Sequence, residues 1–435
     1  MDSGSHAAWR EAASASDFSL VRFRFRNMAL IVQKFGGSSV RDVEHIRNVA
    51  GHVIREVEAG QSVVVAVSAM GDTTDRLVAM ATELMAEPSA REYDMLLASG
   101  EQISSSMLAL AIQARGRDAK SFTGHQVGIQ TDSEHGRARI VHINDDKIRE
   151  ALGSGNVVIV AGFQGVSAEQ EITTLGRGGS DTTAVALAAA LGADRCDIYT
   201  DVEGVYTADP RAVPEARRLD RITYDEMLEL ASLGAKVLHN RSVELAKNYG
   251  VRLRVLSSLK PGPGTLVVQE YDDMEKIVVS GVTLDTSESK ISIVGVPDRP
   301  GVAATIFSRL AEEGVSVDMI IQNVAAQEKN DISFTVKGED FGRAREISEA
   351  LCRELEASEV LTEEGIAKIS VVGVGMRSHS GVAAKLFKAF AEAGVSIKSI
   401  TTSEISISCV IDVDLADKAV QAAHDAFDLG ADASG

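Results

Sequence analysis

The sequence is poor in cysteine, proline, tryptophan and aromatic residues generally. Its 435 residues include 3 Cys, 7 Pro and 1 Trp, and aromatic side chains make up 4%. The cysteines, Cys196, Cys352 and Cys409, lie far apart and are odd in number, so they predict neither a disulfide framework nor a zinc site. We therefore expect a reducing compartment, the cytoplasm.

Positive charge and long apolar runs are also scarce. Lys and Arg number 44 against 63 Asp and Glu, which gives a formal net charge of −19. This excess of negative charge argues against nucleic acid or an anionic membrane surface as the main partner. No apolar run approaches the ~20 residues of a membrane span, so we expect no membrane segment. The length predicts two or three globular domains at ~150 residues each.

The first 27 residues differ from the rest of the chain. They are rich in Ala and Ser and then alternate basic and aromatic side chains from Val21 to Arg26. Acidic residues at positions 2, 11 and 17 argue against a transit peptide. We expect residues 1–27 to be an extension, disordered or not native, upstream of a chain that begins near Met28.

From residue 28 to 270 the pattern is α/β. Short β-branched runs at 30–32, 63–67 and 157–160 predict strands that are buried on both faces. Amphipathic stretches such as 46–58 and 75–85 predict helices between them. This alternation predicts a mostly parallel sheet sandwiched by helices, in one domain over residues 28–270.

The last third of the chain contains an internal repeat. The segment ISIVGV at 291–296 matches ISVVGV at 369–374, and GVAA at 301–304 recurs unchanged at 381–384. Each copy predicts a strand, a glycine turn, a helix and a second strand. We expect two α+β accessory domains, over residues 271–352 and 353–435.

The first candidate site is the motif KFGGSS at residues 34–39, directly after a predicted strand. Gly36 and Gly37 let backbone N–H groups close on an anion, and Lys34 adds a positive charge. A plain glycine turn with a surface lysine is the alternative. The position at a strand end, beside Ser38, favours an anion site, although the spacing is neither that of a P-loop nor G-x-G-x-x-G.

The second candidate is TTLGRGGSDTT at 173–183, which leads into a predicted helix. Its three glycines make a flexible loop, and the free N–H groups of a helix start favour negative charge. Arg177 can form a forked contact with a carboxylate. The alternative is that Ser180 or Asp181 only caps the helix, but a cap rarely needs three glycines and an arginine.

Further polar residues lie where other predicted strands end. The stretch 199–211 opens from a strand into a long polar loop, the usual place for ligand contacts in open α/β sheets. Ser68 ends another strand, Thr74 follows it, and Glu101 lies in the segment Ser-Gly-Glu. Each signal is weak alone, because a glutamate beside a glycine is more often a solvated surface residue.

Together these motifs resemble those of the aspartokinase family, within the amino acid kinase superfamily. The matching features are KFGGSSV at 34–40, VSAMG at 67–71, SGE at 99–101, the loop 173–183, the stretch 199–211, and Lys236 with Val237. The repeat resembles the paired ACT domains, small amino-acid-sensing modules, that follow the kinase domain in this family. The resemblance covers about residues 28–430.

The resemblance implies phosphorylation of the side-chain carboxylate of L-aspartate by MgATP to give 4-phospho-L-aspartate, the first step toward lysine, threonine, methionine and diaminopimelate. It implies catalytic roles for Lys34, Arg177 and Asp181, and substrate binding by Ser68, Thr74, Glu101, Arg177 and Ser180. The implied nucleotide contacts are Lys34, Gly36, Gly37, Ser38, Tyr199, Thr200, Asp201, Tyr206, Arg211, Lys236 and Val237. No resident metal site is expected, since Mg²⁺ would arrive with ATP.

In the repeat, the resemblance implies feedback inhibition by lysine and threonine. The implied effector-binding residues are Asp298, Ser316, Val317, Asp318, Gln322 and Asn323. The second copy has the sequence MRSHSG at 376–381 in place of the Asp298 motif, which indicates a different ligand or a structural role. The family also implies a homo-oligomer formed through the ACT domains, either a dimer or tetramer, or an α2β2 form that arises from an internal start at Met274.

Two other functions remain open at this point. One is another carboxylate kinase of the superfamily, such as a glutamate kinase, which Glu101, Arg177 and the repeat disfavour. The other is a catalytically inactive amino-acid sensor, which the intact Lys34, Arg177 and Asp181 disfavour.

Overall fold

The computed structural model describes residues 29–235, 237–271, 278–324, 329–377, 379 and 381–430. The expectations for residues 1–27, Lys236 and Met274 therefore lie outside the described residues. The chain divides into two compact units. Of the described residues, those up to Gly204 and Leu238–Val268 form the first unit, and those in Val205–Val237 and from Gln269 onward form the second.

The first unit is built on a mostly parallel sheet, as expected. Its strands follow the order β12-β11-β9-β1-β2-β6-β3, and β11 with β12 is an antiparallel pair whereas the other neighbours are parallel. All five residues of the strand VVIVA at 157–161 are buried, which fits a strand covered on both faces. The bounds are β1 Leu30–Phe35, β2 Ser62–Val67, β3 Ala119–Phe122, β6 Val157–Ala161, β9 Arg195–Thr200, β11 Leu253–Ser257 and β12 Thr265–Val268.

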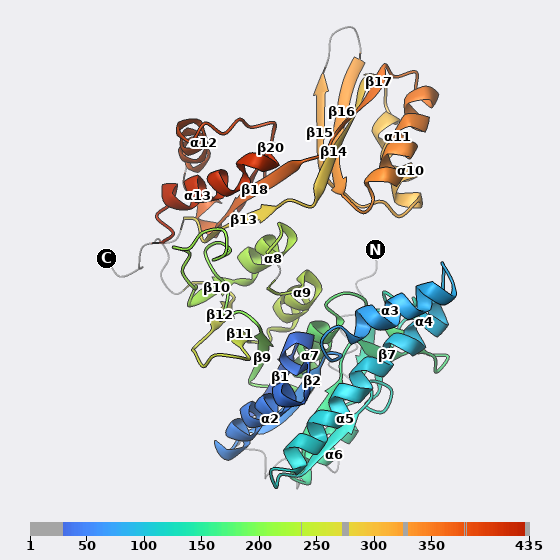
Figure 1. Ribbon diagram of the computed structural model, residues 1–435, viewed down its shortest axis with the longest axis vertical. Helices are drawn as coiled ribbons and strands as arrows, with labels where there is room; N and C mark the ends of the chain where they lie inside the picture. Colours follow the sequence, from blue (N-terminus) through green and yellow to red (C-terminus); the bar gives the residue numbers. More distant parts are fainter. Residues whose placement is uncertain are drawn as a thin grey trace, which may run out of the picture. The chain divides into compact units, whose positions relative to one another are not determined.

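Helices cover both faces of this sheet (Figure 1). On one face, Val53 of α2 (Val43–Glu58) and Leu108 of α5 (Ser99–Gln113) share a core with Phe35. Since side chains alternate along a strand, Lys34 points to the opposite face, where α7 (Gly179–Leu191) packs against β1, β2 and β9. The helices expected at 46–58 and 75–85 are confirmed.

The other elements of the first unit include a smaller sheet of order β5-β4-β7-β8. They are η1 Gly37–Val40, α3 Thr73–Leu84, α4 Ala90–Leu97, β4 Ile129–Thr131, β5 Ile140–Ile143, α6 Asp146–Gly153, β7 Gln164–Val166, β8 Ile172–Thr174 and α9 Asn240–Tyr249. By length and composition alone, the stretch Ala90–Gln113 would pass for a membrane span, which we did not expect from the sequence. Half of its apolar window is buried inside the protein, as in the core helix of a globular domain.

The second unit contains both copies of the repeat, each as a four-stranded antiparallel sheet with two helices. The first sheet has the order β15-β16-β14-β17 and packs on α10 and α11; the second has the order β13-β18-β20-β19 and packs on α12 and α13. The bounds are β13 Gly281–Asp285, β14 Glu288–Pro297, α10 Val302–Glu312, β15 Val317–Val324, β16 Lys329–Lys337, α11 Phe341–Glu354, β17 Glu359–Glu363, β18 Ile366–Val372, η2 Val374–Arg377, α12 Val382–Glu392, β19 Ser399–Thr402, β20 Ser406–Asp412, η3 Val413–Leu415 and α13 Ala416–Ala426. Gly301 and Gly381 precede the first helix of each copy with φ of 96° and 103°. The two copies therefore share the left-handed backbone conformation at this glycine as well as the sequence.

The two sheets do not follow the expected limits of 271–352 and 353–435. Strand β13 precedes the first copy but pairs with β18 of the second, and β17 follows residue 352 but pairs with β14 of the first. Helix α11 also crosses residue 352. The reason is that the sequence repeat marks only the strand–helix–strand part of each copy, whereas the edge strands differ in sequence and are exchanged.

The segment Val205–Val237 lies in the second unit, although we expected it in one domain with the rest of 28–270. Its Ala208 and Val213 are buried in the same core as Ile369 of β18, which explains why the segment packs there. It contains β10 (Arg221–Thr223) and α8 (Tyr224–Ser232), and Thr223 with Glu226 forms a capping box at the start of α8.

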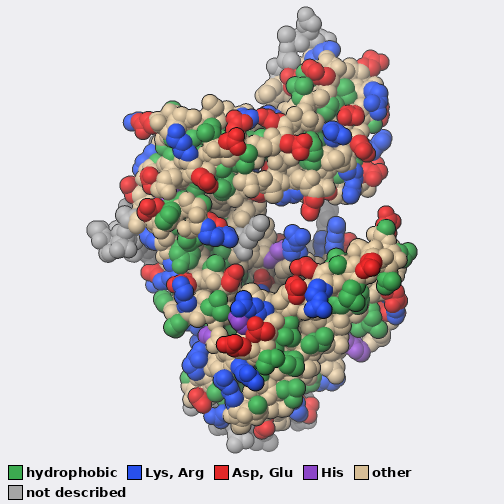
Figure 2. Space-filling model, in the orientation of Figure 1, with side chains coloured by type: hydrophobic (Ala, Val, Ile, Leu, Met, Phe, Trp, Pro, Cys, Tyr) green, Lys and Arg blue, Asp and Glu red, His purple; other side chains and the backbone are tan. Residues whose placement is uncertain are grey.

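Figure 2 shows acidic and basic side chains intermixed over the visible face of the described residues. A continuous basic surface of the kind that binds nucleic acid is not seen on that face, in keeping with the net charge of −19.

The ion pairs of Lys368 join the two repeat sheets, and their contribution to stability can be tested. This lysine of β18 is buried and ion-paired with Glu288 of β14 at 2.8 Å and with Asp318 of β15. Lys368→Met should lower the free energy of unfolding by about 3–5 kcal/mol, because it leaves a buried carboxylate without its main partner. The measurement is urea unfolding followed by far-UV circular dichroism.

The matched control is Lys388→Met, which removes an exposed lysine that is 3.7 Å from Glu392 in α12. An exposed pair of this kind contributes about 0–1 kcal/mol. Equal losses from the two substitutions would contradict a structural role for the Lys368 pair.

Candidate active site

Lys34 and Asp181 form an ion pair at the centre of the candidate site. The Lys34 ammonium at the end of β1 lies 2.6 Å from Asp181 Oδ1 in the first turn of α7, and each side chain is only 12% exposed. A Cβ at position 36 would lie 3.2 Å from the Lys34 nitrogen, so Gly36 leaves room for the ammonium. The pair joins two motifs that the sequence places about 150 residues apart.

The glycine turn after β1 packs tightly on the loop after β2. A Cβ on Gly37 would be 2.9 Å from the Ala69 carbonyl oxygen, and the Gly71 N–H donates to the Gly37 carbonyl at 3.1 Å. Ser38 is exposed, whereas Ser39 Oγ is buried and bonded to Ser258 Oγ at 2.8 Å. The turn is therefore a fixed structure with one exposed hydroxyl.

Glu101 is buried beside the same loop, which corrects the expectation that such a glutamate is usually solvated. Its Oε1 accepts from the Ala69 N–H at 3.0 Å, while Oε2 is buried with no hydrogen-bond partner among the described residues. Burial raises the pKa of the Glu101 carboxyl to about 8, against the lowering effect of the Ala69 hydrogen bond. Half-buried Ser68 and Thr74 flank this loop at the end of β2 and the start of α3.

The loop before α7 is held by close backbone contacts. Gly178 has φ 71°, and a Cβ there would lie 2.3 Å from the ring of His239, a residue that the sequence analysis did not single out. Gly178 is also the N-cap of α7, and among the described residues no side chain caps the helix. The capping alternative for Ser180 and Asp181 is therefore wrong, and the first-turn N–H groups stay available to an anion.

Arg177 and Ser180 lie on either side of that helix start. Arg177 is exposed and forms no ion pair with a described residue, so its guanidinium is available to a ligand. Ser180 is buried, and a Cβ at Gly162, which follows β6, would lie 2.8 Å from its Oγ. The carboxyl ends of β1, β2 and β6 thus meet the start of α7, as the sheet topology predicts for a ligand site.

The implied nucleotide contacts are more scattered. The Tyr199 side chain is buried in the core and stacks on Phe35, with ring centroids 4.5 Å apart, so it packs the sheet rather than facing a ligand. Burial raises the pKa of Tyr199 to about 12. Thr200 Oγ1 donates to Asp201 at 3.0 Å just after β9.

Three other implied nucleotide residues, Tyr206, Arg211 and Val237, belong to the second unit. Arg211 is largely exposed and pairs with Asp209 at 2.7 Å. A group of three or more His, Cys, Asp or Glu side chains suited to a metal ion is not found among the described residues.

The implied effector residues lie in the first repeat sheet and its loops. Exposed Asp298 accepts from Asn330 Nδ2 at 3.0 Å, and Asp318 is paired with Lys368. Ser316, Gln322 and Asn323 are exposed and Val317 is half-buried.

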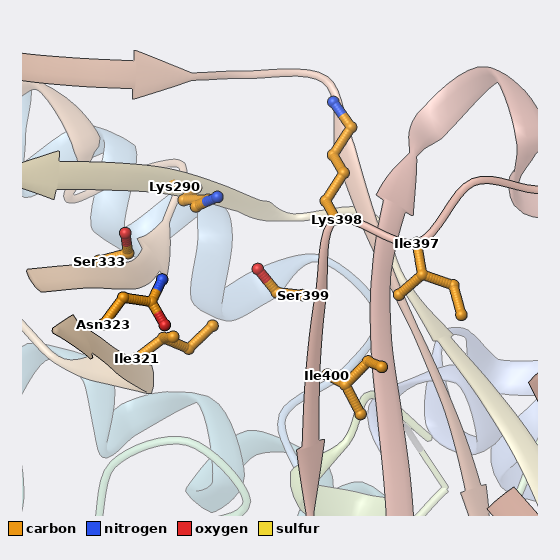
Figure 3. Close-up of a pocket in the computed structure, with 8 residues that line it drawn as sticks. All are labelled: Lys290, Ile321, Asn323, Ser333, Ile397, Lys398, Ser399 and Ile400. Carbon is orange, nitrogen blue, oxygen red and sulfur yellow. The ribbon is translucent and has the colours of Figure 1, made fainter. Parts of the chain in front are cut away.

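A cavity of about 320 Å³ lies beside Asn323 in the second unit. Figure 3 shows Asn323 and Ser333 on one side of it and Ser399 and Ile400 of β19 on the other.

The chain matches two kinds of known protein domain. Residues 29–257 match the amino acid kinase family, and residues 291–350 and 369–427 match the ACT domain. The chain therefore belongs to the class of amino acid kinases that carry ACT domains after the kinase domain. Its kinase sheet has strand ends that meet the start of α7, and two ACT sheets follow it.

Within that class the chain belongs to the aspartokinases. It is 52% identical to the aspartate kinase of Pseudomonas putida over 407 residues, which is 93% of this chain and 99% of that protein. It also resembles Escherichia coli aspartokinase III in complex with aspartate and ADP, with 27% identity, a TM-score of 0.75, and coverage of 91% and 99% of the two chains. The complex of that enzyme with lysine and aspartate gives a TM-score of 0.72 at the same identity and coverage.

The pKa of Glu101 yields a prediction about stability. Its carboxyl titrates at about 8 in the folded protein against 4.5 in the unfolded chain. Between these values the folded state binds more protons, so this residue makes the protein less stable as pH rises from about 4.5 to 8. Glu101→Gln should remove a slope of up to about 1.4 kcal/mol per pH unit.

The measurement is urea unfolding of wild type and Glu101→Gln at pH 5, 6.5 and 8.5. The two proteins should differ little at pH 5, and the variant should become progressively the more stable one at higher pH. A difference that is independent of pH would contradict the assigned environment of Glu101.

Proposed function

We propose that the chain transfers the γ-phosphoryl group of ATP to the side-chain carboxylate of L-aspartate and so forms 4-phospho-L-aspartate. The observation that carries this proposal is the Lys34–Asp181 ion pair, which lies between the glycine turn after β1 and the uncapped start of α7. The E. coli relative bound to aspartate and ADP supports both substrates.

The amino-acid end of the substrate would be held by Glu101 and Arg177. The unpartnered Oε2 of Glu101 is a buried acceptor, and an α-ammonium group would satisfy it and keep the carboxylate ionised. The exposed guanidinium of Arg177 can form a forked contact with the α-carboxylate. Ser68, Thr74 and Ser180 supply hydroxyl groups to the same pocket.

At the phosphoryl end, the acceptor carboxylate is already ionised at neutral pH, so the reaction needs no general base. Catalysis then depends on positioning and on charge stabilisation. Lys34 would neutralise charge on the transferring phosphoryl group, and Asp181 holds the lysine in place. Backbone N–H groups at Gly36 and Gly37 and the exposed Ser38 hydroxyl would bind the phosphate oxygens.

The nucleotide is proposed to contact Thr200 and Asp201, at the end of β9 in the first unit. For Tyr206, Arg211 and Val237, which belong to the second unit, a nucleotide contact stays a prediction from the family resemblance. Tyr199 contributes by packing against Phe35. Mg²⁺ would enter as the MgATP complex, because this ion commonly binds through phosphate oxygens, waters and one or two carboxylates. Asp181 would supply one such carboxylate.

The repeat is proposed to bind lysine and, as a second effector, threonine, and so to inhibit the kinase. The lysine complex of the E. coli relative supports the first effector. Asp298 lies just before α10, so its carboxylate could hold an ammonium group while the helix N–H groups hold the carboxylate of the amino acid. Assembly through the ACT sheets as a dimer or tetramer, and a location in the cytoplasm, remain part of the proposal.

Such regulation has a structural route within the second unit. Glu226 of α8 accepts from Ser280 Oγ at 2.5 Å and from the Val374 N–H at 3.1 Å, at the entry to β13 and in η2 of the second copy. The segment that carries Tyr206 and Arg211 is therefore anchored to the repeat. An effector that binds one conformation of the repeat better than another could therefore shift this segment, and with it Tyr206 and Arg211, within the second unit.

Hydroxamate formation tests the reaction and its substrate. With ATP, hydroxylamine and either L-aspartate or L-glutamate, the wild type should form aspartyl hydroxamate far faster than glutamyl hydroxamate. Lys34→Ala should lower kcat by ~10²-fold or more, because it removes a preorganised charge contact. Lys388→Ala, on the exposed face of α12, should leave kcat unchanged.

Equal rates with the two amino acids would refute the assignment of aspartate as the substrate. A Lys34→Ala variant that kept kcat and showed only a higher KM for ATP would limit Lys34 to a binding role.

Inhibition by lysine tests the effector pocket. Asp298→Ala should raise the lysine concentration for half-inhibition by about 10-fold, within the usual range of allosteric coupling of ~1–3 kcal/mol. Asp298→Asn keeps the acceptor for Asn330 but removes the charge, so it should be as insensitive to lysine as Asp298→Ala. If both variants are inhibited as the wild type is, lysine does not bind through Asp298.

A further inference from the structure

Asp94 in α4 is fully buried, yet the proposed reaction gives it no role. Burial of a carboxylate is costly unless it is well bonded, and here four donor groups surround it. The Thr174 N–H donates to Oδ2 at 3.0 Å and the Thr174 hydroxyl to Oδ1. His135 Nδ1 donates to Oδ2 at 2.7 Å, and the Gly136 N–H lies 3.1 Å from both oxygens.

These bonds join the loop between β4 and β5 to the end of β8. The Ala138 N–H also donates to the Thr174 carbonyl at 2.9 Å, and Arg241 of α9 donates to the carbonyl groups of Leu175 and Ala138 at 2.8 and 2.7 Å. A Cβ on Gly176 would lie 2.9 Å from the Gly136 oxygen. The residues just before Arg177 are therefore fixed, and Asp94 is the charged group at the centre of the network.

Asp94 also lies on the same helical segment as Glu101, formed by α4 and α5. Helix α4 ends at Leu97 and α5 begins at Ser99, with Ala98 between them in the αR conformation. The Ala98 carbonyl accepts from Gln164 Nε2 at 2.8 Å, which secures the junction. Seven residues of near-continuous helix separate Asp94 from Glu101, a rise of about 10 Å.

We propose that Asp94 is a positioning residue that sets the spacing between Glu101 and Arg177, and thereby favours aspartate over the one-methylene-longer glutamate. This inference rests on the proposed function, in which Glu101 and Arg177 hold the two α-groups of the substrate. With those groups fixed, the reach of the side chain toward Lys34 depends on where the Arg177 loop stands relative to α5. Asp94 links that loop to the helix pair that carries Glu101.

Asp94→Asn tests the proposal, because it keeps the shape of the side chain but presents an amide N–H₂ to at least one of the donors. The KM for aspartate should rise by about 10-fold, the equivalent of about 1.4 kcal/mol and close to the lower limit of about 1.5 kcal/mol for one hydrogen bond to a charged group. The KM for ATP should change by less than about 2-fold. The ratio of kcat/KM for aspartate to that for glutamate should fall by a similar 10-fold factor.

Two further comparisons separate positioning from a loss of stability. Asp197→Asn alters another fully buried carboxylate of the first unit, one that is bonded to Arg195 and Arg254. It should lower the melting temperature without changing the ratio of the KM for aspartate to the KM for ATP. Thr174→Val removes only the hydroxyl donor and should reproduce the Asp94→Asn effect in weaker form, and Thr174→Ser should restore the wild-type values. If Asp94→Asn does not fold, the comparison of Thr174→Val with Thr174→Ser tests the positioning role by itself.

The inference is overturned if the Asp94 or Thr174 variants raise the KM for aspartate and the KM for ATP equally. It is also overturned if the preference for aspartate over glutamate stays as in the wild type. In that case wild-type activity with aspartate would still support the proposed function. A wild type that forms no aspartyl hydroxamate would overturn both.

Discussion

The Lys34–Asp181 ion pair is the contact on which the arrangement of the candidate site depends. A lysine ammonium that is 12% exposed needs a carboxylate partner, and the pairing requires the end of β1 to lie against the first turn of α7. Parallel strands bring their carboxyl ends to one edge of the sheet, so the loops after β2 and β6 reach the same place. The absence of a side-chain cap on α7 then leaves its N–H groups facing this edge.

Three of the buried carboxylates in the first unit are accommodated in three different ways. Asp181 is neutralised by Lys34, and Asp94 is stabilised by four donor groups without a lysine or arginine partner. Glu101 has one bonded oxygen and one unpartnered oxygen, and its pKa is raised to about 8. Only the third arrangement is incomplete in the protein alone, which is why Glu101 is suited to a cationic ligand group and Asp94 to a structural task.

Much of the fold and part of the site could be predicted from the sequence. Buried strands such as Val157–Ala161 show in a run of β-branched residues, and the duplicated GVAA segments reveal the two repeat copies. Lys34 and the Arg177 loop stand out because glycines mark them. Asp94 does not stand out, because its partners lie 41 to 80 residues away along the chain, and nothing local distinguishes a buried aspartate in a helix from a solvated one.

The exchanged edge strands and the segment Val205–Val237 escaped the sequence analysis for a related reason. Strand pairing is decided by long-range contacts, and β13 and β17 lie outside the part of each copy that repeats. Ala208 and Val213 are apolar residues that fit any core, and only the assembled fold shows that they enter the core of the second ACT sheet. The division of the chain into compact units thus assigns Lys34 to the first unit and Tyr206 and Arg211 to the second. Within the second unit, Glu226 bonds this segment to Ser280 and to the Val374 N–H, so the segment that carries Tyr206 and Arg211 is held to the second repeat copy rather than to the kinase sheet from which its neighbours in sequence come.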